Sequence, residues 1–383
     1  MNLDLLRRIV NAPGVSGFED EAQALVRAEL EQHADEVWRD RMGNGIAVKR
    51  ATGRGGAAGS GGAAGGSQAA GGSQAASGDS SRPRRLLYAA HVDEIGMMVS
   101  HIDDDGFVRF RTVGGLDPRT LPSERVVVHG TKAGGPTAPP VRLKGVIAPQ
   151  SGWLGTEQDR QRVFPVKELY IDLGRSAKDV RAQVHVGDVI TLAAEFDMLN
   201  DDVVVGRNFD DRIGVFCLVE AFKRITDPPV DVYAVSTVQE EVGVRGIPTA
   251  AHAVEPDIAL AIDGSLPSDT PYALPEERQC ALGDGTGIYL MDNRTIGNPG
   301  LIRGLIDTCE RHGIAYQRNL GGATDASEIQ RRNLGAWATT IGAPTRYMHS
   351  TVQLCHLADV EATIQLLATF PYDAATILPA DWR

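Results

Sequence analysis

The alternation of strand-like and helix-like segments after about residue 200 is the feature that most restricts the fold of this chain. Short apolar runs with the length of buried strands alternate with longer segments that have the apolar spacing of amphipathic helices. The predicted strands are 231–238, 258–262 and 336–341, and the predicted helices lie near 212–225, 301–312 and 358–370. Strands that alternate with helices form a sheet whose faces the helices cover. The sequence therefore predicts an α/β domain.

Between about residues 106 and 199 the pattern differs, because short β-branched runs are separated by glycine and proline. These runs are 125–129, 141–147, 169–173 and 188–192. Such spacing is typical of an all-β module. The chain has 383 residues, more than the roughly 250 to 300 residues at which a single hydrophobic core stops growing, so two domains are expected. We therefore expect a discontinuous α/β domain, residues 1–98 and 198–383, with a β-rich domain, residues 99–197, inserted in it.

The stretch 51–82 has a composition of its own, dominated by Gly, Ala, Ser and Gln. The hexad AAGGSQ occurs at 63–68 and again at 69–74. Such a composition cannot form a hydrophobic core and is typical of a flexible linker. We expect a low-complexity insertion between two strands, without a function of its own.

The charge balance excludes several classes of partner. With 38 Lys and Arg against 50 Asp and Glu, the formal net charge is −12, so a broad basic surface for nucleic acid is not expected. No run reaches the roughly 18 apolar residues of a membrane-spanning helix, and residues 1–9 lack the apolar core of a signal peptide. The four cysteines are scattered without a CxxC pair. We expect a cytoplasmic protein that binds neither nucleic acid nor membrane.

Acidic and histidine side chains follow the predicted strands. In open α/β sheets the ligand crevice lies beyond the carboxyl ends of the strands, so residues at these positions are candidates for a functional site. They are His91 and Asp93 after the strand 86–90, Glu240 and Glu241 after 231–239, Asp263 after 258–262, His349 after the last strand, and Asp210 with Asp211 at the start of a helix. We expect these side chains to converge.

Each of these residues alone has a simpler explanation. Asp210 and Asp211 are suited to cap a helix, and Asp263 before Gly264 is suited to a turn. A single histidine is most often a hydrogen-bonded structural residue, and a pair of glutamates is usually solvated. It is the convergence of all of them that favours a functional site.

Carboxylates that meet at one edge of a sheet repel one another, so Asp210, Glu240, Glu241 and Asp263 require a cation. Lys and Arg are sparse around these positions. Imidazole and carboxylate ligands suit zinc, cobalt or manganese better than calcium. Counting the histidines with the carboxylates, five ligands are more than one tetrahedral site holds. They fit two divalent ions that share a carboxylate, an arrangement that hydrolases use to activate water.

Two neighbouring pairs indicate a division of roles. A ligating imidazole commonly donates its other N–H to a carboxylate, so we expect Asp93 to orient His91. Adjacent Glu240 and Glu241 point in different directions at the end of a strand, so one can bind metal while the other acts as general base. At this point either glutamate fits either role.

Eight motifs are distributed along the chain. They are AAHVDEIGMMV at 89–99, VGGLDPRTL at 113–121, ELYIDLG at 168–174, GRNFDDRIG at 206–214, VQEEVGVRG at 238–246, AIDGS at 261–265, GGATDASEI at 321–329 and TRYMHS at 345–350. Over nearly its whole length the chain resembles the M42 metallopeptidase family, which includes tetrahedral-particle, glutamyl and deblocking aminopeptidases. The resemblance implies a mixed-sheet α/β exopeptidase domain with an inserted barrel-like dimerisation domain. Because such dimers often build a hollow tetrahedral dodecamer, a homo-oligomer is expected.

The resemblance also implies the roles of individual residues around two divalent ions, zinc or cobalt. By matching motifs, Asp210 bridges the ions, His91 and Asp263 complete one, Glu241 and His349 complete the other, Glu240 is the general base, and Asp93 orients His91.

The expected function is that of a metallo-aminopeptidase, which removes N-terminal residues from peptides by metal-activated water with Glu240 as general base. A metal-dependent deacylase or amidase acting on small N-acyl amino acids uses the same ligand set and is the alternative. A non-catalytic assembly scaffold is a further alternative, since a fold does not guarantee turnover. Glycosidase activity is disfavoured, because it needs two carboxylates that are free to exchange protons.

The chain departs from the family pattern in two places. The insertion at 51–82 replaces a short connection, and residues 264–271 differ from the usual Val-Thr continuation after Asp263. The second departure affects the expected substrate preference rather than catalysis. Asp325 is expected either to line the same pocket or to cap a turn.

Overall fold

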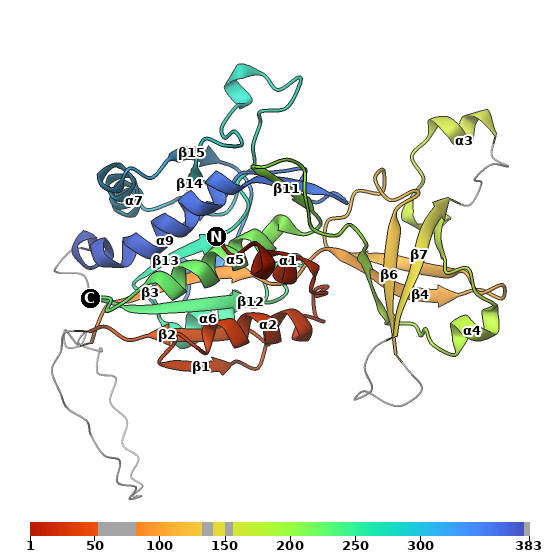
Figure 1. The fold of residues 1–383 in the computed structure, drawn as a ribbon, viewed down its shortest axis with the longest axis horizontal. Helices are drawn as coiled ribbons and strands as arrows, with labels where there is room; N and C mark the ends of the chain where they lie inside the picture. The colour runs from red at the N-terminus through yellow and green to blue at the C-terminus, as the bar shows by residue number, and fades with distance from the viewer. Residues whose placement is uncertain (53–81, 132–140, 150–155, 379–383) are drawn as a thin grey trace, which may run out of the picture.

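The protein, described by a computed structural model over residues 1–52, 82–131, 141–149 and 156–378, has two parts that lie side by side (Figure 1). The larger part is α/β and the smaller is a barrel. The chain enters the barrel after β3 (Arg85–His91) and has returned to the α/β part before α5 (Phe209–Arg224). The predicted insertion falls almost entirely on residues 53–81, which lie outside the described residues.

An eight-stranded mixed sheet forms the centre of the α/β part. Its order is β1 (Glu36–Arg39), β2 (Gly45–Lys49), β12 (Asp231–Thr237), β3, β13 (Ile258–Ile262), β16 (Trp337–Gly342), β14 (Thr286–Met291) and β15 (Tyr316–Leu320). The central strands β12, β3, β13 and β16 are parallel. Because both faces of a parallel sheet are covered, β12 and β13 are buried along their whole length.

Helices cover both faces of this sheet. Five helices share a hydrophobic cluster with one face, namely α1 (Leu3–Asn11), α2 (Asp20–Leu30), α5, α7 (Pro299–His312) and α9 (Leu357–Ile377). On the other face, α6 (Ile247–Val254) and α8 (Ala326–Ile329) belong to a second cluster. The helix α5 packs against β3, α1 and α9 and is buried on nearly every side. Its first turn is therefore held firmly at the edge of the sheet.

A small antiparallel sheet lies beside the start of α5. Its strand order is β10 (Asp197–Met198), β11 (Val203–Gly206), β18 (Gln353–His356) and β17 (Thr345–Arg346). The strand β11 ends just before α5, and the loop between β17 and β18 contains His349. This sheet thus brings His349 close to the N-terminal turn of α5.

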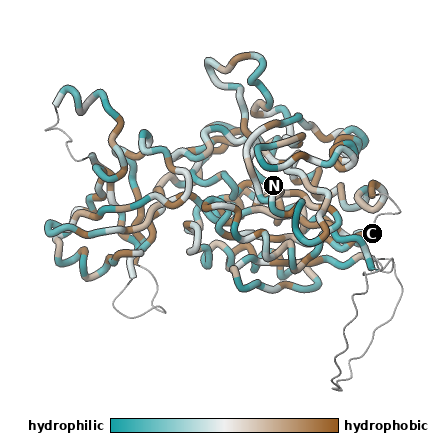
Figure 2. The backbone as a smooth tube through the Cα atoms, turned by 180° about the vertical axis from the view of Figure 1, so that it is seen from behind, coloured by the Kyte–Doolittle hydropathy of each residue, from teal (hydrophilic) through white to brown (hydrophobic). Residues whose placement is uncertain are grey.

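The inserted part is a closed six-stranded barrel. Its antiparallel strands follow the order β4 (Gly96–Ile102), β5 (Val108–Val113), β8 (Leu169–Asp172), β7 (Val141–Pro149), β6 (Arg125–Gly130) and β9 (Val189–Leu192), which pairs back with β4. Buried and exposed residues alternate along β6 and β7, as they must when one face of each strand lines the interior. The interior is a separate hydrophobic cluster, and Figure 2 shows hydrophobic segments in both parts.

The predicted mixed α/β architecture with an inserted β-rich part is confirmed. The predicted strand 258–262 coincides with β13, and the predicted helix 301–312 lies within α7. Two short helices that were not predicted, α3 (Glu157–Gln161) and α4 (Ala177–Arg181), connect strands of the barrel. In α4, Ser176 caps the first turn by accepting the backbone N–H of Asp179, which stabilises a helix too short to show a hydrophobic period.

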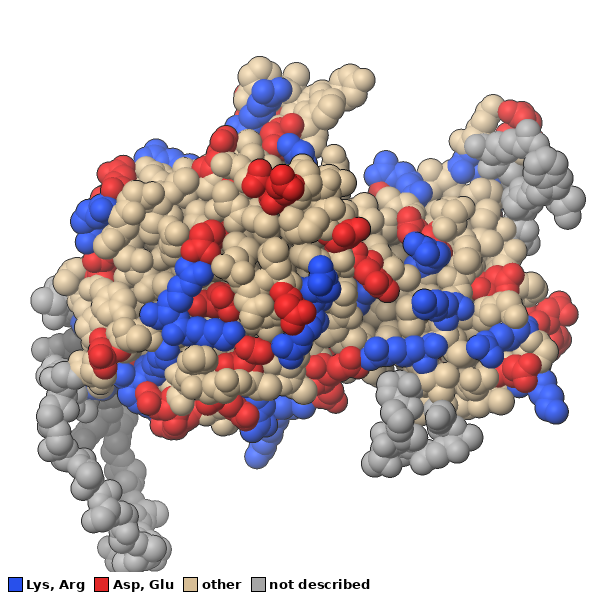
Figure 3. All heavy atoms as spheres, viewed as in Figure 1, with Lys and Arg blue, Asp and Glu red and all other residues tan. Residues whose placement is uncertain are grey.

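Among the described helices, none has the length and apolar character needed to cross a membrane. On the face shown in Figure 3, Lys and Arg side chains are interspersed with Asp and Glu over both parts of the molecule.

Candidate metal centre

The candidate residues meet where the central strands end. Because β12, β3 and β13 are parallel and in register, with Thr237 beside His91, their carboxyl ends share one edge of the sheet. The last residue of β3 is His91, and Asp263 directly follows β13. Glu240 and Glu241 come shortly after β12, Asp210 lies in the first turn of α5, and His349 follows β17. The structure therefore brings together at this edge side chains from three strands of the central sheet, from α5 and from the small sheet.

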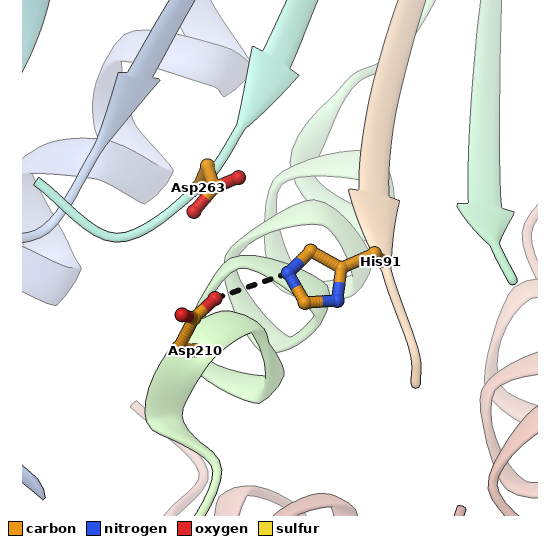
Figure 4. Close-up of side chains that lie close together, drawn as sticks. All are labelled: His91, Asp210 and Asp263. Atoms are coloured by element: carbon orange, nitrogen blue, oxygen red, sulfur yellow. Dashed lines mark hydrogen bonds and ion pairs between the residues drawn. The ribbon is translucent and has the colours of Figure 1, made fainter. Parts of the chain in front are cut away.

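One group of possible ligands is fully buried. Ligand atoms of His91, Asp210 and Asp263 all lie within 4.8 Å of one another. The imidazole Nε2 of His91 is 3.0 Å from Oδ1 of Asp210. In Figure 4, His91 projects from the end of β3 towards Asp210 on α5, and Asp263 approaches from the neighbouring strand.

A second group shares Asp210 with the first. It comprises Asp210, Glu241 and His349, again with ligand atoms within 4.8 Å of one another. Nε2 of His349 lies 3.3 Å from Oδ2 of Asp210 and 3.5 Å from Oε2 of Glu241. The two oxygens of Asp210 thus face different histidines. Because the His349 side chain is 48 % exposed while that of Glu241 is 3 % exposed, the centre is open to solvent on the His349 side.

Asp93 links the end of β3 to the loop after β12. Its Oδ1 accepts the backbone N–H of Glu240 at 2.9 Å, and its Oδ2 accepts that of Glu241 at 3.1 Å. Nδ1 of His91 lies 3.5 Å from Oδ1 of Asp93 and 3.2 Å from its backbone carbonyl oxygen. The carboxylate is completely buried. Asp93 therefore contacts His91 and holds the backbone of both glutamates.

Asp211 is a further member of the centre, for which the sequence suggested helix capping but no role in metal binding or catalysis. Its Oδ2 accepts the backbone N–H of His91 at 3.2 Å, and its Oδ1 accepts that of Gly214 at 3.1 Å. A Cβ atom at Gly214 would lie 2.1 Å from Oδ1 of Asp211, so only glycine fits there. The peptide bond between Asp210 and Asp211 is cis. The sequence signal for this residue was the Asp-Asp pair at the start of the helix. Asp210 faces the two histidines, and Asp211 caps the helix.

Backbone conformations that are unfavourable for residues other than glycine occur at two positions, one in the centre and one next to it. Gln239, which precedes Glu240, has φ of 56°, and His349 has φ of 60°. Such left-handed conformations are rare for non-glycine residues and persist only where surrounding contacts impose them. The backbone of the glutamate pair and of His349 is therefore held in place by its neighbours.

Burial raises the pKa of most acidic groups in the centre, whereas at Asp210 and Asp93 hydrogen bonds to histidine outweigh burial and lower the pKa. Burial and, to a smaller extent, the neighbouring Asp210 together raise the pKa of Glu241 to about 8. Burial also raises the pKa of Glu240 and Asp263 well above the usual range. For His349, the hydrogen bond to Asp210 raises the pKa to about 9. Raised carboxyl pKa values indicate a site that lacks positive charge and will take up either protons or a cation.

The donor set fits divalent metal. Within the described part of the chain, the ion pairs of Asp210 and Glu241 are with histidines, and none of the centre's carboxylates pairs with Lys or Arg. Buried carboxylates without such partners are destabilising unless a cation joins them. Two imidazoles and three carboxylates form the donors of the two groups, a combination typical of zinc or cobalt sites.

Asp325 lies close to this centre, at the start of α8. One of its oxygens accepts the hydroxyl of Thr237 at 2.6 Å, and the other, although buried, has no hydrogen-bond partner among the described residues. Its side chain does not cap α8. The turn-capping alternative is therefore not what the structure has.

Comparison with known proteins identifies the family of the chain. The model of the M42 glutamyl aminopeptidase family matches residues 72–366. The chain is 29 % identical to the lysyl aminopeptidase of Pyrococcus furiosus, over 95 % of this chain and 94 % of that protein.

Solved structures of aminopeptidases have the same fold. An aminopeptidase from the archaeon Desulfurococcus kamchatkensis superposes with a TM-score of 0.83 at 32 % identity, covering 99 % of this chain and 98 % of that one. The TET1 peptidase of Pyrococcus horikoshii, which can assemble into a tetrahedron or a large octahedral shell, gives a TM-score of 0.78 at 31 % identity, covering 97 % and 99 %. The chain belongs to the M42 glutamyl aminopeptidase family.

Proposed function

We propose that this protein is a dinuclear metal-dependent aminopeptidase that removes N-terminal residues from peptides. As a member of the M42 family it is a metallo-aminopeptidase, a hydrolase acting on peptide bonds. The single observation that carries the dinuclear proposal is the position of Asp210, which belongs to both groups of possible ligands and offers one oxygen to each.

In this proposal each ion has its own ligands besides the shared Asp210. His91 and Asp263 hold one ion, and Glu241 and His349 hold the other. Mixed imidazole and carboxylate donors favour zinc or cobalt. When bound, the two ions supply the Lewis acidity that polarises the peptide carbonyl and makes a water molecule acidic near neutral pH.

Glu240 is the proposed general base. Its backbone N–H is held by Asp93, which also contacts His91, and it belongs to neither group of possible ligands. A carboxylate at this position accepts a proton from the attacking water and returns it to the nitrogen of the leaving amine. Asp93 orients His91 and fixes the backbone from which Glu240 extends.

The same acidic surroundings favour a substrate with a free N-terminus. An α-ammonium group brings positive charge to a site rich in buried carboxylates, whereas an acylated N-terminus brings none. This charge preference supports the aminopeptidase over a deacylase that acts on N-acyl amino acids.

We further propose that the division of the chain is a division of roles. Residues 1–98 and 198–383 carry the centre, and residues 99–197 form a dimerisation domain. The separate core of the barrel supports a domain of its own, and the shells formed by the TET1 peptidase of Pyrococcus horikoshii support a homo-oligomer whose dimers build a tetrahedral dodecamer. All four cysteines are buried and free, which supports a reducing compartment such as the cytoplasm.

Hydrolysis of a panel of aminoacyl p-nitroanilides tests this proposal, with an N-acetylated aminoacyl p-nitroanilide as the matched control. Each substrate is measured before chelation, after chelation, and after zinc or cobalt is restored. We expect activity on free amino termini that chelation abolishes and metal restores. Activity on the acetylated control alone would instead assign the protein as a deacylase, and no hydrolysis with metal bound would favour the scaffold.

A further inference from the structure

A loop from the N-terminal region crosses the edge of the sheet next to the metal centre. This loop, residues 12–19, connects α1 to α2 and is called here the N-terminal strap. Val15 forms a parallel bridge with Glu94. The backbone N–H of Glu94 donates to the carbonyl of Gly14, and the N–H of Gly14 donates to Oε1 of Glu94, both at 2.9 Å. The strap is therefore bonded to the chain just beyond His91.

Ser16 of this strap contacts the centre through Asp93. Its hydroxyl donates to Oδ2 of Asp93 at 2.6 Å. Ser16 is 7 % exposed and Asp93 is 0 % exposed, so water does not replace this hydrogen bond readily. The same Oδ2 accepts the backbone N–H of Glu241. Ser16 and Glu241 thus fix one oxygen of Asp93 together, while Glu240 fixes the other.

The strap also holds the backbone that follows β12. Oε1 of Glu19 accepts the backbone N–H of Gly17 at 2.7 Å within the strap and that of Gln239 at 3.2 Å. Gln239 has a left-handed backbone and directly precedes the proposed base, Glu240. The loop that connects α1 to α2 is therefore bonded to the residues on both sides of the centre.

We infer that Ser16 is a positioning residue of the metal centre, whose hydroxyl fixes the Asp93 carboxylate in the orientation that places His91 and the two glutamates. This inference rests on the proposed function. A buried carboxylate that loses one of its donors must find another partner or rotate. Because the oxygens of Asp93 hold the backbone of Glu240 and Glu241, a rotation would displace the proposed base and a proposed ligand together.

Ser236 provides a matched control for a merely structural hydrogen bond. Its hydroxyl donates to Oε1 of Gln23 at 2.6 Å, also in the interior. This bond, like that of Ser16, joins the N-terminal region to the sheet, because Gln23 lies in α2 and Ser236 in β12. It does not include any member of the centre. Loss of either hydroxyl should cost similar stability, but only loss of Ser16 should affect the centre.

The test compares Ser16→Ala, Ser16→Thr and Ser236→Ala in the full chain. The measurements are melting temperature, kcat and KM on an aminoacyl p-nitroanilide, and the Co²⁺ dissociation constant of the metal-free protein in competition with a chelator. Partners of metal ligands typically contribute about 10- to 100-fold to affinity or activity. We expect Ser16→Ala to lower kcat by at least about tenfold and to weaken Co²⁺ binding by about as much, with KM changed less than about twofold.

Ser16→Thr keeps the hydroxyl and should recover most of kcat and of Co²⁺ affinity. Ser236→Ala should lower the melting temperature comparably while changing kcat and Co²⁺ affinity by less than about twofold. If Ser16→Ala does not fold, Ser16→Cys replaces it, because its thiol keeps the shape but is a weak donor. Ser16→Cys should then show the same losses.

A Ser16→Ala protein that loses stability as Ser236→Ala does, yet keeps kcat and Co²⁺ affinity, would overturn the positioning role. The proposed function fails separately, if the wild-type protein shows no metal-restored hydrolysis. In that case the Co²⁺ affinities of the variants still decide whether Ser16 positions the centre.

Discussion

Asp210 presents its Oδ1 atom to the imidazole of His91 at 3.0 Å. Its other oxygen, Oδ2, faces a second histidine, His349, at 3.3 Å. One carboxylate therefore connects a buried histidine from the central sheet to an exposed histidine from the C-terminal region. A side chain in this position serves both groups of possible ligands at once, so its loss should affect both proposed ions.

The first prediction concerns this shared carboxylate. Asp210→Asn keeps the size of the side chain but removes the charge that both ions need. We expect metal content to fall from two ions towards none and kcat/KM to fall by at least about 100-fold, beyond the range for outer partners of metal ligands. Elemental analysis of the purified protein and p-nitroanilide hydrolysis measure both. Asp104→Asn, at a fully exposed aspartate, is the control, and loss of only one ion would contradict a bridging role.

The second prediction separates the general base from the ligands. Glu240→Gln should lower kcat by about 10²- to 10⁴-fold, because the amide cannot accept the proton from water. Metal content should stay at the wild-type level, since Glu240 belongs to neither group of possible ligands. Glu241→Gln is the matched comparison at the adjacent residue and should lose metal as well as activity. Hydrolysis that persists undiminished in Glu240→Gln would show that another group is the base.

The third prediction concerns the ion pair that anchors the strap. Nε of Arg207 donates to Oε2 of Glu94 at 2.9 Å, with both side chains almost completely buried. Removing one partner of a buried pair leaves an uncompensated charge, so Arg207→Ala should lower the free energy of unfolding by about 3 to 5 kcal/mol. Urea denaturation followed by circular dichroism measures this change. Arg119→Ala, at an exposed ion pair with Asp117, should have a much smaller effect. Equal losses of stability would contradict the argument that burial makes the Arg207–Glu94 pair costly to break.

The fourth prediction is a pH dependence of stability at a buried carboxyl group away from the centre. Burial raises the pKa of Asp359 from 3.8 to about 6, although the backbone N–H groups of Gly283 and Gly285 act in the opposite direction. Between pH 4 and pH 6 the folded state therefore binds more protons at this group than the unfolded state, so its contribution lowers stability as the pH rises. A shift of this size corresponds to about 3 kcal/mol.

The variant Asp359→Asn removes this titration, at the expense of one of the two backbone hydrogen bonds to Gly283 and Gly285. The lost hydrogen bond changes the free energy of unfolding by an amount that does not depend on pH. The test is therefore how the difference in stability between variant and wild type changes with pH. Urea denaturation at several pH values should show the stability of the variant rising relative to wild type from pH 4 to pH 7. A difference that stays constant across this range would refute the raised pKa of Asp359.

Much of the α/β part could be predicted because its elements carry local signals. The strand β13 and the helix α7 have a strong apolar pattern, and both were predicted within a few residues. The edge strand β15 was missed, because its sequence YQRNL is mostly polar and only Asn319 is buried. The strands β10 and β17 have only two residues each, which is too short for any period to appear.

The sequence by itself indicated which residues can form the centre, because predicted buried strands end abruptly in His91 and Asp263 and because the acidic residues Glu240, Glu241 and Asp210 lie at or near the ends of other predicted elements. Tertiary structure alone decided how they are joined. It set the two oxygens of Asp210 between two histidines and placed the hydroxyl of Ser16, in a loop without any distinctive pattern, on Asp93. Local periodicity reports which residues are buried, whereas contacts between distant segments depend on the packing of the whole sheet and its helices.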